Sequence, residues 1–179
     1  LVSPVDGTVS QSGRIKAGRI FQAKGQDYTV RELLACDGAT AEVFDEGQFA
    51  TIYLSPRDYH RMHMPLKGEL LEQVHVPGRL FSVAPHTVTT VSRIFARNER
   101  VIARFQTEYG QMIMVLVGAI NVAAIETVWD GLVTPPKGKQ VGRKQYDAGQ
   151  VVLEKGEEMG RFNMGSTVVL LVESSDPAL

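Results

Sequence analysis

Glycine spacing is the feature that most constrains the fold of this chain. Seventeen glycines punctuate its 179 residues at irregular intervals and separate short apolar stretches. This arrangement is typical of a domain in which turns join short strands. The stretches are rich in Val, Ile and Thr, which favour the strand conformation. The sequence therefore predicts strands at residues 49–54, 88–94, 100–106, 112–117, 122–128, 151–154 and 167–172.

Helix signals are scarce. One short helix is predicted at residues 30–35 and a second at residues 55–63. The second has a clear start, because Ser55 can cap it, Pro56 suits its first position and Asp58 stands where the acid of a capping box would be. Hairpin turns are predicted at residues 109–110 and 155–156, and a long exposed excursion at residues 134–149.

Composition fits one globular domain. Hydrophobic residues make up 44% of the chain and charged residues 22%, close to the globular averages. We therefore expect a single catalytic domain over residues 1–179, of the α+β class and dominated by strands, with a barrel-like or sandwich β core and a few short helices. The most apolar run, residues 112–125, is too short to cross a bilayer as a helix.

Charge and cysteine content exclude several partners. Nineteen basic and twenty acidic residues give a net charge of −1, which leaves no overall surplus for nucleic acid. The single cysteine, Cys36, cannot form an internal disulfide, and we expect a structural role for it. The chain opens without an initiator methionine, so we expect it to be part of a longer gene product.

Two segments carry histidine or acidic groups suited to catalysis. The Asp6-Gly7 pair is typical of a turn. If residues 55–63 are helical, His60 and His63 lie three residues apart and share one face. They could form half of a metal site, although no third ligand is evident, so we expect no metal. His75 and His86 stand alone, and a structural role is expected for both.

The junction between Gly165 and Ser166 suits one unusual reaction. A serine hydroxyl can attack the carbonyl of the preceding residue if the backbone there is bent, and glycine at that position permits such a conformation. A histidine would take the hydroxyl proton and an aspartate would orient the histidine, as in a hydrolase triad turned on the chain itself. As a plain sequence, however, the segment is also typical of a turn that enters a strand.

Four segments, in this order, resemble the bacterial, membrane-associated type of phosphatidylserine decarboxylase. They are residues 3–7 (SPVDG), 53–65 (YLSPRDYHRMHMP), 95–101 (FARNERV) and 158–167 (EMGRFNMGST). The resemblance covers nearly the whole chain. Met164 replaces the family's usual leucine before the Gly-Ser pair, a swap of similar volume. We expect the family's N-terminal, membrane-contacting segment to lie outside this sequence.

The resemblance implies how the chain matures. A cut between Gly165 and Ser166 would give a β subunit of residues 1–165 and an α subunit of residues 166–179, with Ser166 converted to a covalent pyruvoyl group. Asp6, His63 and Ser166 would form the self-cleavage triad, and His60 would act in decarboxylation. The α and β subunits would share one core as a heterodimer that assembles further into a homo-oligomer.

The resemblance also implies the reaction and its setting. The mature enzyme would convert phosphatidylserine to phosphatidylethanolamine and CO₂ at a membrane lipid surface, on the cytoplasmic face of the bacterial inner membrane. Two alternatives stay open. One is a serine hydrolase that uses the same triad on an external substrate, although the G-x-S-x-G elbow is missing. The other is a Gly-rich β carrier module, although Lys155 lacks the characteristic neighbours of a modified lysine at a hairpin tip.

Overall fold

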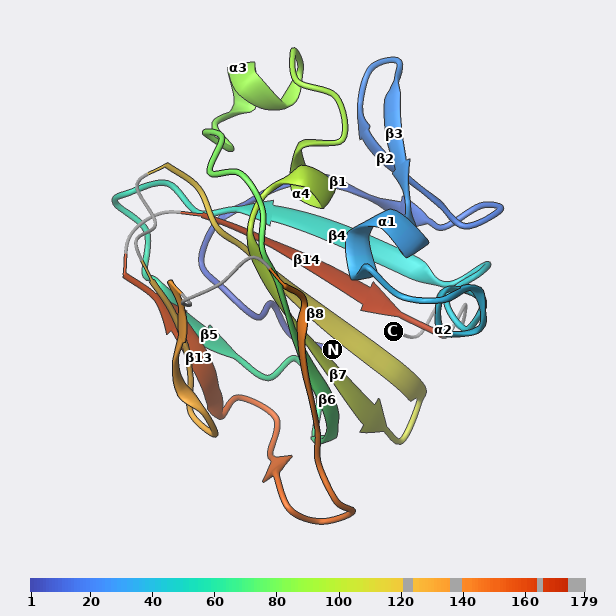
Figure 1. The fold of residues 1–179 in the computed structure, drawn as a ribbon, viewed down its shortest axis with the longest axis vertical. Coiled ribbons are helices and arrows are strands. Elements are labelled where there is room, and N and C mark those ends of the chain that lie inside the picture. Colours follow the sequence, from blue (N-terminus) through green and yellow to red (C-terminus); the bar gives the residue numbers. More distant parts are fainter. Residues whose placement is uncertain (121–123, 136–139, 164–165, 174–179) are drawn as a thin grey trace.

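A large open antiparallel sheet forms the body of the molecule (Figure 1). The computed structural model describes residues 1–120, 124–135, 140–163 and 166–173. The strands of the large sheet, in spatial order, are β1 (Thr8–Arg14), β4 (Gln48–Tyr53), β14 (Thr167–Val172), β8 (Gly110–Val117), β7 (Arg100–Thr107), β6 (Gly68–Val76) and β11 (Gly142–Gln145), with β12 (Val152–Leu153) also on β6.

Smaller elements complete the fold. A four-stranded sheet has the order β10 (Gly131–Thr134), β9 (Ile125–Thr127), β13 (Glu158–Phe162) and β5 (Arg61–His63). A separate hairpin joins β2 (Arg19–Ala23) to β3 (Gln26–Thr29). The helices are short: α1 (Val30–Leu34), α2 (Gly38–Glu42), α3 (Pro85–Val88) and α4 (Ile94–Arg97).

The four-stranded sheet packs against one face of the large sheet. Gln73 of β6 accepts hydrogen bonds from Thr127 Oγ1 at 3.2 Å and Trp129 Nε1 at 2.8 Å. The Trp129 ring also meets Phe105 of β7 edge to face, with 5.9 Å between ring centroids. These partners place the partly buried Trp129 between the two sheets, in agreement with the structural role that a single tryptophan suggests.

Helix α1 covers the opposite face of the large sheet. Arg100 of β7 is buried, and its guanidinium donates to the carbonyl oxygens of Leu33 at 2.6 Å and Glu32 at 2.8 Å, at the end of α1. Burial lowers the pKa of Arg100 to about 10. A cation beside the last carbonyls of a helix is favourable, because those groups lack partners within the helix.

Strand β14 lies near the middle of the large sheet. All six of its residues are buried, and it pairs in register with β4 on one side and β8 on the other. A run of six apolar or β-branched residues suits a strand covered on both faces. The start of β14, where Ser166 lies, is therefore held by two neighbouring strands.

Several sequence predictions are confirmed. The strands expected at residues 49–54, 100–106, 112–117 and 167–172 correspond to β4, β7, β8 and β14, and the helix expected at residues 30–35 corresponds to α1. The turn before Gly110 joins β7 to β8. The domain is dominated by strands with few short helices, as expected. The barrel-like alternative is wrong, because the large sheet is open.

The helix predicted at residues 55–63 is wrong. The expected capping contact does form, because the Asp58 carboxylate accepts from Ser55 N at 2.7 Å, but it closes a single turn. The chain then extends, and β5 pairs with β13 at residues 158–161. This pairing buries Met62, and burial in the tertiary structure outweighs the local helix signal. His60 and His63 therefore do not share a helix face.

Other local predictions need correction. The strand expected at residues 88–94 is wrong, since this stretch runs from the end of α3 to the start of α4. Residues 155–156 do form a turn, but β12 and β13 on either side of it pair with different strands, so it is not a hairpin. The strand expected at residues 122–128 is represented by β9, while residues 122 and 123 lie outside the described part.

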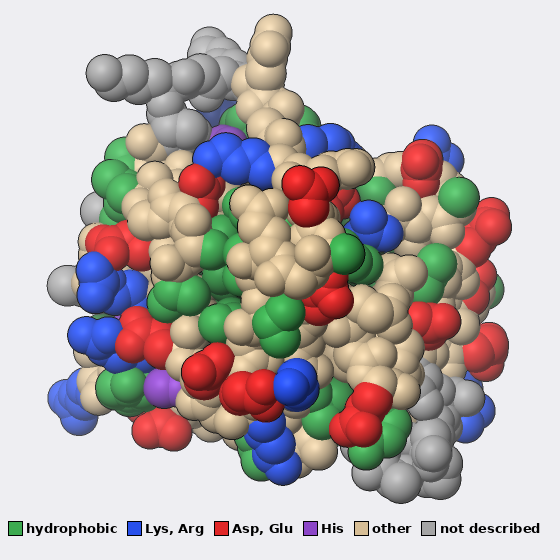
Figure 2. Space-filling model, turned by 90° about the horizontal axis from the view of Figure 1, so that it is seen from below, with side chains coloured by type: hydrophobic (Ala, Val, Ile, Leu, Met, Phe, Trp, Pro, Cys, Tyr) green, Lys and Arg blue, Asp and Glu red, His purple; other side chains and the backbone are tan. Residues whose placement is uncertain are grey.

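The surface mixes charges of both signs. On the face seen in Figure 2, basic and acidic side chains are interspersed, and hydrophobic side chains form separate groups between them. Several opposite charges pair, among them Lys67 with Glu154 at 2.5 Å and Arg61 with Glu158 at 2.6 Å. Exposed pairs of this kind contribute about 0–1 kcal/mol each. Among the described helices, none has the length and apolar character needed to cross a membrane.

Candidate active site

Ser166 lies directly before β14 with a buried and unpaired hydroxyl. The residue is fully buried, and its Oγ has no hydrogen-bond partner among the described residues. Its carbonyl oxygen accepts from Leu54 N at 2.7 Å, which fixes the backbone against the end of β4. Buried polar side chains are usually hydrogen-bonded, so an unpaired hydroxyl at this place needs an explanation. Gly165, the other half of the predicted cleavage site, lies outside the described residues.

His63 is held in a defined orientation on β5. Its ring Nδ1 lies 2.8 Å from the Gly156 carbonyl oxygen and its Nε2 lies 3.2 Å from the Tyr59 hydroxyl. The ring also stacks on Tyr59 with 5.8 Å between centroids. Because a carbonyl can only accept, Nδ1 carries the proton and Nε2 presents its lone pair. His63 therefore has the tautomer of a base that acts through Nε2.

His60 precedes β5 and has a different environment. Its Nε2 is buried and has no hydrogen-bond partner among the described residues, while its carbonyl oxygen accepts from Phe162 N at 2.9 Å. Phe162 ends β13, four residues before Ser166. The two histidines thus differ: the ring of His63 is engaged at both nitrogens, and the ring of His60 has an unpaired Nε2.

Asp6 lies close to this region but its carboxylate is exposed. The backbone nearby is fixed, because His63 N donates to Pro4 O at 2.8 Å. No hydrogen bond joins Asp6 to His63 among the described residues, where the partners of the His63 ring are Tyr59 and Gly156. The role of Asp6 in a triad stays a prediction.

Strand pairing brings the predicted segments to one end of the sheets. Thr8, Tyr53 and Thr167 lie directly opposite one another across β1, β4 and β14. Asp6 is two residues before Thr8, and Ser166 immediately precedes Thr167. The chain leaving β4 leads to His60, whose backbone is bonded to the end of β13. Strand pairing and these backbone hydrogen bonds therefore bring the segments that carry Asp6, His60 and Ser166 to the same end of the sheets.

A pocket of about 300 Å³ opens at the start of β14, on the face of the large sheet that α1 also covers; its lining includes Thr167, the residue after Ser166, but not Ser166 itself. It reaches the start of β14 through Thr167, whose buried Oγ1 has no hydrogen-bond partner among the described residues. Its volume is at the lower end of the range for small-molecule sites. The pocket is lined by Thr8, Ser10, Gln11, Gln22, Ala23, Tyr53, Val83, Pro85, Val88, Thr89, Phe95 and Thr167.

The lining is uncharged. It contains no Lys, Arg, Asp, Glu or His, and its polar members are hydroxyl or amide side chains. Sequence reasoning missed this pocket, because its walls come from the hairpin, from three strands and from residues 83–95, which carry no shared motif. It also missed Tyr59, whose contact with His63 depends on the turn and strand that replace the predicted helix.

The remaining candidates from the sequence have other surroundings. His75 is nearly buried, and its Nε2 lies 3.0 Å from Glu99. His86 is exposed on α3. Cys36 is half-buried, and burial raises the pKa of its thiol. Within the described ranges, no group of three or more His, Cys, Asp or Glu side chains is arranged to hold a metal ion.

Comparisons with known proteins agree with this description. The family model for phosphatidylserine decarboxylase matches residues 1–178. The phosphatidylserine decarboxylase proenzyme of Alkalilimnicola ehrlichii is 58% identical over 179 residues, which are 99% of this chain and 62% of the relative. That of Shewanella loihica is 59% identical over 174 residues, 96% of this chain and 61% of the relative.

The chain belongs to the phosphatidylserine decarboxylase family. A third relative, the phosphatidylserine decarboxylase proenzyme of Shewanella baltica strain OS155, is 59% identical over 96% of this chain and 60% of its own length. The chain thus spans about three-fifths of the length of these curated relatives. The word proenzyme in their names says that those proteins are made as precursors.

Proposed function

We propose that this chain is the catalytic part of a phosphatidylserine decarboxylase that cuts itself between Gly165 and Ser166 and converts Ser166 to a pyruvoyl group. The observation that carries the proposal is the buried Ser166 hydroxyl without a partner, at the start of a central strand and beside an uncharged pocket. Conversion of Ser166 to a pyruvoyl group places the ketone at its Cα and leaves a methyl group at Cβ, which removes a hydroxyl that makes no hydrogen bond to a described residue. The surroundings of Ser166 therefore fit the group.

Self-cleavage needs a base for the Ser166 hydroxyl. With Nδ1 donating to Gly156, the lone pair of His63 Nε2 is the proton acceptor, and rotation of the Tyr59 hydroxyl would free it. Ser166 Oγ then attacks the Gly165 carbonyl carbon, the peptide C–N bond breaks and an ester forms. Removal of the Ser166 Cα proton breaks the Cβ–O bond and expels the Gly165 carboxylate. The dehydroalanine left behind tautomerises and is hydrolysed with loss of ammonia.

Decarboxylation would take place at residue 166, next to Thr167, through which the uncharged pocket reaches the start of β14. The pyruvoyl ketone would supply an acceptor for the electron pair released as CO₂ leaves. The pocket lining offers the substrate carboxylate no cation, and loss of a carboxylate charge is favoured where water and counter-charges are excluded. His60, with its unpaired Nε2, is the proposed donor of the proton that replaces CO₂.

The proposed substrate, partners and location follow from the family. The substrate is phosphatidylserine and the product phosphatidylethanolamine, with the enzyme at a membrane lipid surface on the cytoplasmic face of the bacterial inner membrane. Residues 1–165 and 166–179 form the two subunits of one heterodimer, which assembles further into a homo-oligomer. The names of the relatives support the substrate.

The two alternatives receive less support. A hydrolase of the nucleophile-elbow type carries its serine in a G-x-S-x-G motif, whereas Ser166 is followed by Thr167 and Val168 in this chain. A carrier module presents its lysine at the tip of a hairpin, whereas the turn at Lys155 joins strands that do not pair with each other.

Intact-mass measurement under denaturing conditions tests the proposed cleavage. The wild-type protein should give two fragments that separate between residues 165 and 166, the second with a pyruvoyl N-terminus. Ser166→Ala should remain one chain, because the nucleophile is lost. Ser12→Ala, on the exposed strand β1, is the matched control and should be cleaved like the wild type. Two fragments from Ser166→Ala would rule out the proposed site.

The two histidines should separate in a second experiment. His63→Ala should stay uncleaved, since positioned base catalysis contributes about 10²–10⁴-fold to a rate. His60→Ala should be cleaved but release CO₂ from phosphatidylserine at least about 10²-fold more slowly. Full activity of cleaved His60→Ala would remove His60 from the mechanism, and rapid cleavage of His63→Ala would remove His63 from self-processing.

A further inference from the structure

Gln22 connects the hairpin to the opposite wall of the pocket. It lies on β2, its side chain is 1% exposed and it lines the pocket beside Ser166. We propose that Gln22 is a positioning residue for the substrate, because its carboxamide fixes the pocket wall formed by residues 83–95. This inference rests on the proposed function of the pocket and concerns a residue outside the predicted cleavage machinery.

The wall that Gln22 contacts has little structure of its own. Residues 83–95 supply Val83, Pro85, Val88, Thr89 and Phe95 to the pocket. Their regular structure consists of α3 and the start of α4, which have four residues each. Helices this short are unstable in isolation, because nucleation is unfavourable and few internal hydrogen bonds form. Contacts with the rest of the molecule must therefore set the shape of this wall.

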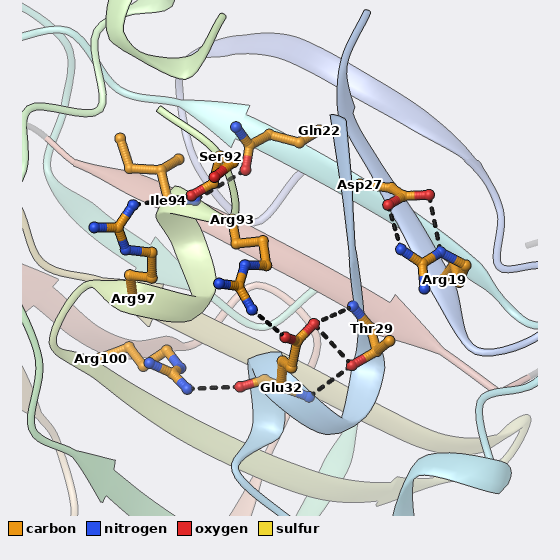
Figure 3. A network of polar contacts seen from close by, with 10 residues as sticks. All are labelled: Arg19, Gln22, Asp27, Thr29, Glu32, Ser92, Arg93, Ile94, Arg97 and Arg100. Carbon is orange, nitrogen blue, oxygen red and sulfur yellow. Dashed lines mark hydrogen bonds and ion pairs between the residues drawn. The ribbon is translucent and has the colours of Figure 1, made fainter. Parts of the chain in front are cut away.

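Gln22 supplies hydrogen bonds that both short helices lack. Its Nε2 donates to the carbonyl oxygens of Val88 and Val91, each at 2.8 Å. Its Oε1 accepts from Ile94 N at 2.9 Å (Figure 3). Val88 is the last residue of α3 and Ile94 the first of α4. The residue directly before each helix, Ala84 or Arg93, makes no capping hydrogen bond with its own side chain. One side chain thus caps the end of α3 and the beginning of α4 from a distant strand.

The hydrogen bonds of Gln22 should stabilise the wall more than the polar contacts made by neighbouring side chains, because two of them are buried. The bonds to Val88 and Ile94 are buried. Two polar contacts from other elements also hold the same segment, the Arg93–Glu32 ion pair at 2.9 Å and the bond from Gln26 Nε2 to Thr89 O at 3.0 Å, but both are exposed. The Phe95 ring also meets Tyr28 edge to face, with 6.1 Å between ring centroids, but this contact provides no hydrogen bond to the ends of α3 and α4. Loss of a partner is more damaging in a buried place, where water cannot replace it.

Removal of the carboxamide should therefore loosen the wall without disturbing residue 166. Ser166 is held by Leu54 and by the pairing of β14, none of which involves Gln22. Substrate binding would weaken because the wall would have to be ordered during binding. Self-cleavage, which needs no substrate, would continue.

Gln22→Met is the sharpest test, because it keeps the length of the side chain and removes its hydrogen bonds. The protein should be fully cleaved, and its KM for phosphatidylserine in detergent micelles should rise by about fivefold to tenfold, with kcat changed less than about twofold. Backbone amide hydrogen exchange across residues 88–94 should become faster. An unchanged KM in cleaved Gln22→Met, or unchanged exchange, would overturn the proposal.

Two further variants complete the test. Arg93→Met breaks the exposed ion pair on the same segment and should keep the wild-type KM; an equal rise in KM would overturn a special role for Gln22. Gln22→Glu keeps an acceptor for Ile94 N but sets a carboxylate against two carbonyl oxygens, so it should raise KM even if Gln22→Met fails to fold. A wild-type protein that neither cleaves nor releases CO₂ would contradict the proposed function, while hydrogen exchange would still test Gln22.

Discussion

The carbonyl oxygen of Tyr53 leaves no room for a side chain at residue 7. A Cβ added to Gly7 would lie 2.5 Å from that oxygen, closer than real Cβ contacts. The sequence suggested a turn at Asp6-Gly7, and glycine in a turn often adopts a positive φ, but Gly7 is not among the glycines with positive φ. Close approach of the backbone to β4 explains this glycine, which lies between Asp6 and the first residue of β1.

Gly7→Ala should therefore lower the free energy of unfolding by about 1–3 kcal/mol, as expected for overpacking. Gly142→Ala is the control, since the nearest atom to its added Cβ, His75 Cβ, is 4.0 Å away, and its effect should stay within about 0.5 kcal/mol. Urea denaturation of both variants, measured on uncleaved Ser166→Ala protein, compares them on one covalent chain. Equal stability of the two would contradict this account of Gly7.

At the scale of elements, α1 is stabilised at both ends by side chains. Thr29 Oγ1 accepts from Glu32 N at 3.1 Å, and Glu32 Oε2 accepts from Thr29 N at 2.9 Å, which completes a capping box. Arg100 donates to the carbonyls at the other end. Glu32 also pairs with Arg93 before α4 (Figure 3). The hydrogen bond from Thr29 N lowers the pKa of Glu32 most, and the hydrogen bond from Arg93 lowers it further, so that it lies below its ordinary value of 4.5.

Acid should remove the stability that the Glu32 charge provides. Because the folded pKa is lower than the unfolded one, this contribution is fully present above pH 4.5 and is lost as the pH falls through the folded pKa. Glu32→Gln should reduce stability at neutral pH by less than about 1 kcal/mol, since the side chain is 38% exposed, and the difference from the wild type should shrink below about pH 4. Urea denaturation across this range measures it.

Glu46→Gln serves as the control for that titration. Glu46 is exposed and makes no hydrogen bond to a described residue, so its substitution should change stability little at any pH. A difference between Glu32→Gln and the wild type that grows with acidification would show that the sign of this argument is wrong.

The elements also differ in how well the sequence predicts them. Strand β14 and helix α1 were predicted closely, because an apolar, Val-rich run and a short helix-favouring stretch are local signals. The capping box at Thr29 and Glu32 was found only in the structure. The segment at residues 55–63 carried a helix start signal and still became a turn and a strand, because β13 is available to pair with it. For α3 and α4, the carboxamide of Gln22 lies 66 and 72 residues away, beyond any local pattern.

At the scale of the whole molecule, the proposed α subunit supplies a central strand of the core. Strand β14 lies between β4 and β8 and is fully buried. Cleavage before residue 166 would cut the chain without removing either ladder of hydrogen bonds. The reactive end of the small fragment would stay fixed against the segment that carries His60 and His63.

The two fragments of the mature protein should therefore stay together under native conditions. We expect them to co-elute in size-exclusion chromatography and to separate only in denaturant, because removal of β14 would expose six buried residues. Treatment with urea below the unfolding midpoint should leave the complex intact. Dissociation of the small fragment in native buffer would contradict this prediction.

Local patterns in the sequence were enough to predict the turn-rich arrangement of strands, the apolar run of β14, the short helix α1 and the order of the motifs that resemble the family. Only the tertiary structure decided that residues 61–63 form a strand, that the pocket beside Ser166 is uncharged and that Gln22 holds its wall. The physical reason is that these features are contacts between distant residues, and their free energy appears only when folding brings both partners together.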